Sequence, residues 1–223
     1  TADSNISGTI NVFEAARTVR IRKVIYAETS AIYEGSSLFP TPESEEKPVS
    51  FYACSKLAAS LFARSYIRLY GMNLTGLRYF NVYGPRQDYR RSIPPVFSAF
   101  MISLLKKRKP VIYGDGKKRR DFVYVDDVNN FHLLAMQDDR TNGNIYNIGS
   151  GKNFSIQEMY DLICSLVGVK VRPRYAQDLP GEAQITLADI SLARSLGWEP
   201  KVDLAAGLKE TLNFIKTHVM RKL

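Results

Sequence analysis

The sequence lacks several features that would place the protein in a specialised class. It has only two cysteines, Cys54 and Cys164, which excludes a disulfide framework, and no Cys-x-x-Cys pair suggests zinc or any other metal site. No run of about eighteen apolar residues occurs, so no membrane span is expected. No basic stretch followed by an apolar segment opens the chain, as it would in a secretory signal. We therefore predict a cytoplasmic globular protein with reduced thiols.

Acidic residues are also few, since 31 Lys and Arg face 22 Asp and Glu, a formal net charge of +9. Much of the excess lies in two basic clusters, at 106–109 and 117–120. Such clusters can bind nucleic acid, but neither is interleaved with aromatic residues as in a single-strand groove. The first cluster closes an apolar helix pattern, where cations complement the helix dipole. An anionic small ligand explains the charge at least as well, and we expect no nucleic-acid partner.

A glycine-rich dinucleotide loop is missing as well. Neither G-x-G-x-x-G nor G-x-x-G-x-x-G occurs in the 223 residues. The run 149–152, Gly-Ser-Gly-Lys, lacks the spacing of a Walker phosphate loop, and we interpret it as a turn after a strand.

What is present is an alternation of helix and strand patterns, typical of an α/β protein with a mostly parallel sheet. Helices are predicted at about 6–19, 50–70, 94–107, 190–196 and 204–218. Strands are predicted at about 23–27, 73–78, 111–113, 122–125, 144–148 and 169–175. Asp126 is expected to cap the helix that follows 122–125, and Ser155 with Glu158 predicts a capping box at another helix.

Tyr52 and Lys56 stand four residues apart in the predicted helix 50–70, so their side chains share one face. A tyrosine with a pKa of about 10 is only about one part in a thousand ionised at neutral pH. A nearby cation favours the phenolate, which can then remove a proton from a hydroxyl group. The spacing is common by chance, and alone it fits an ordinary surface helix equally well.

Three further segments change that interpretation. Residues 77–87 read LRYFNVYGPRQ, residues 27–33 read AETSAIY, and residues 187–208 read LADISLARSLGWEPKVDLAAGL. With Tyr52 and Lys56, and in this order, they resemble the extended short-chain dehydrogenase/reductase family, specifically its NAD-dependent nucleotide-sugar epimerases. The resemblance runs the whole length of the chain. It implies a Rossmann-like doubly wound parallel sheet with a smaller C-terminal α/β substrate lobe.

The resemblance also implies how the chain is divided. Residues 1–80 would be the C-terminal part of the NAD-binding Rossmann domain and 81–223 mainly the substrate lobe, with segments near 122–148 returning to the main domain. The family's glycine-rich turn and ribose-binding acid would precede Thr1. We therefore expect a sheet that is incomplete at its N-terminal side and weak NAD binding by the chain as given. Helices 6–19 and 50–70 would form a homodimer contact.

The resemblance assigns the chemistry to Thr29, Tyr52 and Lys56. Thr29 would hydrogen-bond the reacting sugar hydroxyl and share its proton with Tyr52, and Lys56 would also bind the nicotinamide ribose. Sister enzymes that dehydrate the sugar carry an Asp-Glu pair directly after this threonine, where this sequence has Ser30 and Ala31. The implied reaction is therefore inversion of a UDP-sugar at C4 through a transient 4-keto sugar, and not 4,6-dehydration.

Binding residues follow from the same resemblance. Further NAD contacts would come from Tyr79, Phe80 and Asn5, although Asn5 fits a plain helix N-cap equally well. The residues implied for UDP-sugar binding are Ser30, Asn81, Val111, Tyr113, Arg120, Glu182 and Thr186. Among them, Asn81 and Arg120 would hold the diphosphate and Glu182 the ribose hydroxyls. Tyr113 would lie beside uracil, unless it is a core aromatic.

Two positions bear on affinity and specificity. Relatives often carry a diphosphate-clamping arginine where this sequence has Leu179, and Arg174 or Arg86 could substitute for it. Thr186 is small where a large aromatic would restrict the pocket to plain hexoses, so it predicts room for an N-acetyl group. UDP-glucuronate epimerisation or decarboxylation, a heptose-nucleotide epimerase and a nucleotide-sugar binding module without catalysis stay open as alternatives.

Overall fold

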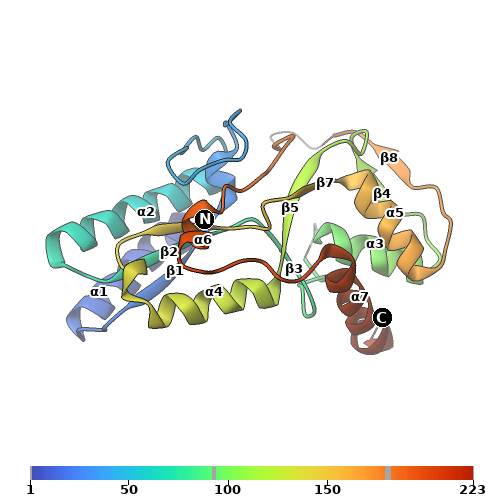
Figure 1. Cartoon of the computed structure of the whole chain (residues 1–223). Helices are drawn as coiled ribbons and strands as arrows, with labels where there is room; N and C mark the ends of the chain where they lie inside the picture. The colour runs from blue at the N-terminus through green and yellow to red at the C-terminus, as the bar shows by residue number, and fades with distance from the viewer. Residues whose placement is uncertain (1, 92–93, 179–181, 223) are drawn as a thin grey trace.

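The computed structural model describes residues 2–91, 94–178 and 182–222 and contains two neighbouring lobes (Figure 1). In the first lobe, three parallel strands lie in the order β1 (Val24–Thr29), β2 (Leu74–Tyr79) and β6 (Ile145–Ile148). Helices α1 (Gly8–Thr18) and α2 (Phe51–Tyr70) cover one face of this sheet, and α4 (Val125–Gln137) covers the other. The predicted α/β Rossmann-like class is confirmed.

Alternating apolar side chains hold the helices to this sheet. Val24 and Tyr26 of β1 pack with Phe13 of α1, whereas Ile25 between them packs with Phe131 of α4. This is the period-2 alternation of a strand that has helices on both faces. The central strand β2 is buried from Leu74 to Arg78, as expected for a strand paired on both sides.

Helix α2 carries the Tyr-x-x-x-Lys pair and has well-defined ends. Ser50 is its N-cap, and the Ser50 hydroxyl accepts a hydrogen bond from Ala53 N at 3.1 Å. Gly71 ends the helix in the left-handed conformation, with φ of 64°, which glycine adopts without steric cost. The helix predicted at 50–70 is therefore confirmed.

The second lobe is built from short strands and three longer helices (Figure 1). Strands β3 (Asn81–Tyr83), β5 (Arg119–Tyr124) and β7 (Asn153–Ser155) form one sheet, and β4 (Val111–Tyr113) pairs with β8 (Arg174–Ala176). Helices α3 (Val96–Leu105), α5 (Ile156–Val167) and α7 (Leu204–Phe214) pack on a core that includes Tyr83, Phe97 and Phe122. The short helix α6 (Ser191–Ser195) lies against β6 of the first lobe.

Several predicted boundaries change. Asp126 does not cap α4, because the helix already begins at Val125 and Asp126 lies in its first turn. The strand predicted at 169–175 is confined to Arg174–Ala176. The sequence patterns also missed β3, because the chain leaves one sheet at Tyr79 and enters another at Asn81. The capping box of Ser155 and Glu158 is confirmed at the start of α5.

The Gly-Ser-Gly-Lys run at 149–152 is a turn between β6 and β7, as predicted. The buried Asp121 carboxylate organises it by accepting hydrogen bonds from Ser150 N (2.7 Å) and Gly151 N (3.1 Å). A Cβ on Gly149 would lie 2.6 Å from Ala188 Cβ, so the turn needs glycine for this close approach. A protein carboxylate therefore occupies the donors that a phosphate would use.

Both cysteines are free, with Cys54 exposed and Cys164 buried. Over the described ranges, no helix is long and apolar enough to cross a bilayer. Within the same ranges, no group of three or more His, Cys, Asp or Glu side chains is arranged to hold a metal ion.

Candidate active site

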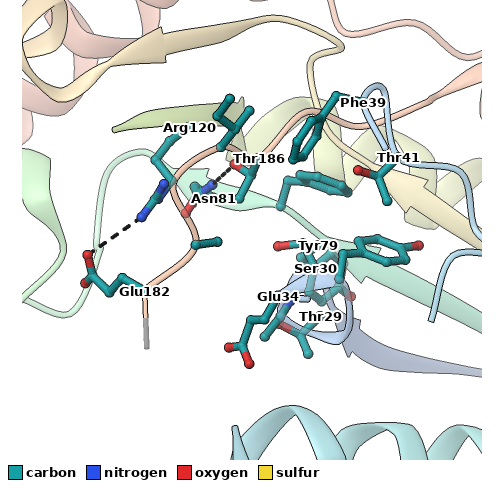
Figure 2. Close-up of a pocket in the computed structure, with 15 residues that line it drawn as sticks. Thr29, Ser30, Glu34, Phe39, Thr41, Tyr79, Asn81, Arg120, Glu182 and Thr186 are labelled. Carbon is teal, nitrogen blue, oxygen red and sulfur yellow. Dashed lines mark hydrogen bonds and ion pairs between the residues drawn. The ribbon is translucent and has the colours of Figure 1, made fainter. Parts of the chain in front are cut away.

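A cavity of about 340 Å³ lies at the carboxyl ends of β1 and β2, the edge where parallel sheets bind ligands (Figure 2). Eight residues predicted for the site line it: Thr29, Ser30, Tyr79, Phe80, Asn81, Arg120, Glu182 and Thr186. They come from four separate stretches of sequence, and the fold brings them together.

A second cavity of about 350 Å³ adjoins the first, and Asn81, Arg120 and Glu182 line both. Val111 and Tyr113, the residues predicted to lie beside uracil, line the second cavity. Tyr113 is 45% exposed, so the alternative that it is a core aromatic is wrong. The shared residues place the two cavities side by side, so together they offer one region next to Thr29 and Ser30 and another next to Tyr113.

Thr29 ends β1 and begins the 3-10 turn Ser30–Tyr33. Its hydroxyl oxygen accepts a hydrogen bond from Ala31 N at 3.2 Å, so Thr29 does cap its own backbone. A hydroxyl group also has one hydrogen to donate, and Thr29 lines the cavity. The hydrogen bond from Ala31 N therefore holds the Thr29 side chain in place and leaves its hydroxyl hydrogen available to a ligand.

Lys56 points from α2 to the carboxyl end of β1, where its Nζ donates to the Ala27 carbonyl oxygen. Burial lowers the pKa of Lys56, and the nearby Glu28 carboxylate opposes that shift. Tyr52 lies one turn earlier on the same helix face and is 46% exposed. Among the described residues that line the two cavities, Tyr52 is absent, so its approach to Thr29 stays a prediction.

Asn5 is not a helix N-cap, and that alternative is wrong. It lies inside a π-helical turn, Asp3–Ser7, that runs directly into α1. Its Nδ2 donates to Ser55 Oγ at 3.0 Å, which ties this turn to the helix that carries Tyr52 and Lys56.

Tyr79 and Phe80 close the floor of the first cavity. The Tyr79 hydroxyl lies 2.9 Å from His132 Nε2, and burial raises the pKa of Tyr79 to about 12. Phe80 is buried, and its N–H donates to Ile148 O at 3.0 Å. The Tyr79 hydroxyl and the Phe80 N–H thus already have partners. The predicted contact of these two residues with nicotinamide would therefore use their other ring and backbone atoms.

Asn81 and Thr186 lie next to each other on the side of the cavity that carries Arg120, and they are hydrogen-bonded (Figure 2). Asn81 Nδ2 donates to Asp121 O (2.8 Å) and Thr186 Oγ1 (3.3 Å), and Thr186 Oγ1 also accepts from Asp121 N (3.0 Å). Both amide hydrogens of Asn81 thus have protein partners. The predicted binding of the diphosphate by Asn81 therefore requires the Asn81 amide to give up one of these hydrogen bonds and donate to a phosphate oxygen instead.

A cluster of paired charged side chains lies where the two cavities adjoin. Arg120 Nη2 lies 3.7 Å from Glu182 Oε2, and Lys118 Nζ lies 2.6 Å from the same oxygen. Lys118 is only 5% exposed and also pairs with Asp178. Burial alone would lower the pKa of Lys118, but the two carboxylates outweigh it and raise this pKa. The two cations and the two carboxylates balance in formal charge, so an anionic ligand would compete with Glu182 and Asp178 for Arg120 and Lys118.

Lys118 is a candidate that the sequence interpretation missed, because only Arg120 was singled out from the cluster 117–120. The alternation of side chains along a strand could have indicated Lys118. It directly precedes β5, two residues before Arg120, so the two side chains point to the same face. Lys118 also lines the second cavity, beside Arg120. Leu179 itself lies outside the described residues, and neither Arg174 nor Arg86 is among the described residues that line either cavity.

Comparisons with known proteins identify the family of the chain. The NAD dependent epimerase/dehydratase family matches residues 1–149, and the chain belongs to this family. A UDP-glucuronate 4-epimerase of Thermodesulfobacterium geofontis is 36% identical over 97% of this chain, which spans 66% of that protein. The chain therefore covers about two thirds of this relative's length.

Two solved structures are similar over nearly the whole chain. A UDP-glucose 4-epimerase of Thermotoga maritima with UDP-glucose has a TM-score of 0.93 and 34% identity, covering 98% of this chain and 71% of its own. A UDP-N-acetylglucosamine 4-epimerase of Methanobrevibacter ruminantium in complex with UDP-N-acetylmuramic acid has a TM-score of 0.92 and 31% identity, covering 99% and 70%.

Proposed function

We propose that this chain carries the proton-transfer and substrate-binding residues of an NAD-dependent UDP-sugar 4-epimerase. The observation that supports this most directly is the pair of adjoining cavities, with hydroxyl side chains lining the first, the exposed Tyr113 lining the second, and the Arg120–Glu182 ion pair lining both. The family and the named substrates of similar proteins point the same way. The proposed division at residue 80, the cytoplasmic location and the homodimer stay predictions.

Each proposed binding role follows from the position of the side chain. Uracil would lie by Val111 and Tyr113, and the diphosphate at Arg120 and Lys118. The planar guanidinium of Arg120 can donate to two phosphate oxygens at once. The sugar would then reach Thr29 and Ser30 in the first cavity.

For the reaction, Tyr52 as phenolate would take the proton from the sugar 4-hydroxyl, with Thr29 donating or accepting in the same hydrogen-bond chain. When bound, NAD supplies reversible hydride acceptance at C4. Lys56 fits a contact with the ribose of NAD. Its ammonium has three N–H donors, and among the described residues one of them donates to Ala27 O. The remaining N–H donors can bind ribose hydroxyls.

The test of the proposed function is direct. The full-length protein that contains this chain is incubated with UDP-glucose and NAD, and the products are separated and identified by NMR. We expect UDP-galactose to accumulate to an equilibrium ratio that is reached from either sugar. If none of UDP-glucose, UDP-N-acetylglucosamine and UDP-glucuronate is inverted at C4, the proposal is wrong.

Changing Thr186 to tyrosine should separate the two neutral substrates. The larger ring would fill space in the first cavity, so we expect turnover of UDP-N-acetylglucosamine to fall at least about tenfold more than that of UDP-glucose. Thr186→Val is the matched control, because it removes the hydroxyl that accepts from Asp121 N but keeps the size. An equal loss for both sugars in Thr186→Tyr would contradict a role in substrate size.

Changing Arg120 to methionine should weaken nucleotide binding. We expect the Kd of UDP, measured by calorimetry, to rise about tenfold to a hundredfold, because a charge-assisted bidentate contact is lost. Lys117→Met is the matched control: its side chain is 85% exposed and pairs with Asp115 away from the cavities. Arg120→Met with an unchanged Kd would remove Arg120 from the diphosphate site.

A further inference from the structure

A glutamate lines the sugar end of the first cavity. Glu34 lies beside Thr29 and Ser30, one 3-10 turn after them in the chain (Figure 2). The other charged side chains that line this cavity are Arg120 and Glu182, which pair with each other on the opposite side. Among the described lining residues, the end that holds Thr29 therefore carries one charge, and it is negative.

The position of the Glu34 carboxylate is fixed by α2. Ser50 N donates to Glu34 Oε2 at 2.8 Å, and the Ser50 hydroxyl donates to Glu34 Oε1 at 3.1 Å. Because Ser50 is the N-cap of α2, the carboxylate also lies at the positive end of this helix. Both oxygens are held, so the side chain cannot simply swing away from an incoming ligand.

We propose that Glu34 makes this site select neutral UDP-hexoses and UDP-N-acetylhexosamines against UDP-hexuronates. The inference rests on the proposed function and names its substrate class. A hexuronate differs from a hexose by a carboxylate on the sugar ring, which would enter the same cavity as Glu34. Within a cavity of about 340 Å³ the two carboxylates would lie no farther apart than about one Debye length, roughly 8 Å at physiological ionic strength, so the like charges repel.

Neutral groups near Glu34 do not remove this repulsion. The hydroxyls of Thr29 and Ser30 line the cavity and can donate hydrogen bonds to a carboxylate, whereas the Thr41 hydroxyl already donates to Leu38 O at 2.8 Å. They offer the same bonds to the hydroxymethyl oxygen of a hexose, so they favour neither sugar by charge. A like charge opposite the unwanted ligand is a common way in which binding sites reject it.

The test compares two substrates in the full-length enzyme. Steady-state kcat/KM is measured for UDP-glucuronate and for UDP-glucose, and their ratio is compared between the wild type and Glu34→Gln. We expect UDP-glucose to be preferred by the wild type and the ratio to rise at least about tenfold in the variant, which corresponds to about 1.4 kcal/mol. Glu45→Gln, a matched loss of charge on a residue that pairs with Lys47 outside the cavity, should leave the ratio unchanged.

A measurement on the wild type alone provides a second test. Raising the ionic strength from about 0.01 M to about 0.15 M shortens the Debye length from roughly 30 Å to 8 Å, so the UDP-glucuronate to UDP-glucose ratio should rise. The diphosphate is common to both substrates and cancels in the ratio. The salt-dependent ratio remains informative if Glu34→Gln does not fold.

Two results would overturn the inference and leave the proposed function intact. One is a wild type that inverts UDP-glucuronate as efficiently as UDP-glucose. The other is a Glu34→Gln variant that loses activity equally on both substrates, which would make Glu34 only a support for the start of α2. A wild type inactive on every UDP-sugar would instead refute the proposed function, and the selectivity with it.

Discussion

Tyr52→Phe is expected to lower turnover of a UDP-sugar by about a hundredfold to ten-thousandfold, the range that a general acid or base contributes. The substitution keeps the aromatic ring and its packing, and it removes the hydroxyl, which is the only ionisable group of the Tyr52 side chain. UDP binding should persist, because Tyr52 is not among the described residues that line the two cavities. Steady-state kinetics and a calorimetric Kd for UDP on the full-length enzyme separate the two effects.

Tyr70→Phe is the control for this change. Tyr70 lies in the last turn of the same helix and is 56% exposed, so loss of its hydroxyl should leave both turnover and UDP binding unchanged. Near-normal turnover in Tyr52→Phe would remove Tyr52 from the proton transfer. A parallel loss of UDP binding would instead point to a damaged fold.

Arg78→Met is expected to lower the free energy of unfolding by about 3–5 kcal/mol, the typical cost of breaking a buried ion pair. Arg78 lies in the central strand and is fully buried. Its Nε donates to Glu28 Oε2 at 2.6 Å, and its Nη1 donates to Tyr33 Oη at 2.9 Å. Methionine would leave the buried Glu28 carboxylate without its cation.

Urea unfolding followed by circular dichroism measures this loss. Arg22→Met is the control, because Arg22 is 81% exposed in its pair with Asp139 and such surface pairs contribute about 0–1 kcal/mol. Adding Glu28→Gln to Arg78→Met should recover part of the stability, since it removes the unpaired charge. A loss in Arg78→Met no larger than in the control would contradict a stabilising role for the buried pair.

The contacts of Arg78 show that one residue of the LRYFNVYGPRQ segment has a structural role. Arg78 belongs to the LRYFNVYGPRQ segment on which the family resemblance rests. Its Nη2 also pairs with Glu46, and Glu28 directly precedes Thr29 in β1. Arg78 therefore ties the central strand to β1 and to the segment between β1 and α2. We infer that this residue supports the site and does not touch the substrate.

Local interactions explain why much of the fold could be predicted from the sequence. The ends of α2, the capping box of Ser155 and Glu158, and the turn at 149–152 all depend on residues a few positions apart. The i, i+4 spacing of Tyr52 and Lys56 is likewise a property of any helix. These features, with the segments that carry the family resemblance, were sufficient to predict the fold class and the reaction type.

The tertiary structure alone decided which distant side chains meet. The pairs Asn81–Thr186, Lys118–Glu182 and Arg78–Glu28 each join separate elements. Glu34 comes to line the first cavity for the same reason, since its contact with Ser50 depends on how α2 packs on β1. Sequence patterns report short-range geometry, whereas packing and burial set the partners of a buried charge. The sequence thus determined the family and proposed the proton-transfer residues, and the tertiary structure decided how the side chains that line the two cavities are held and charged.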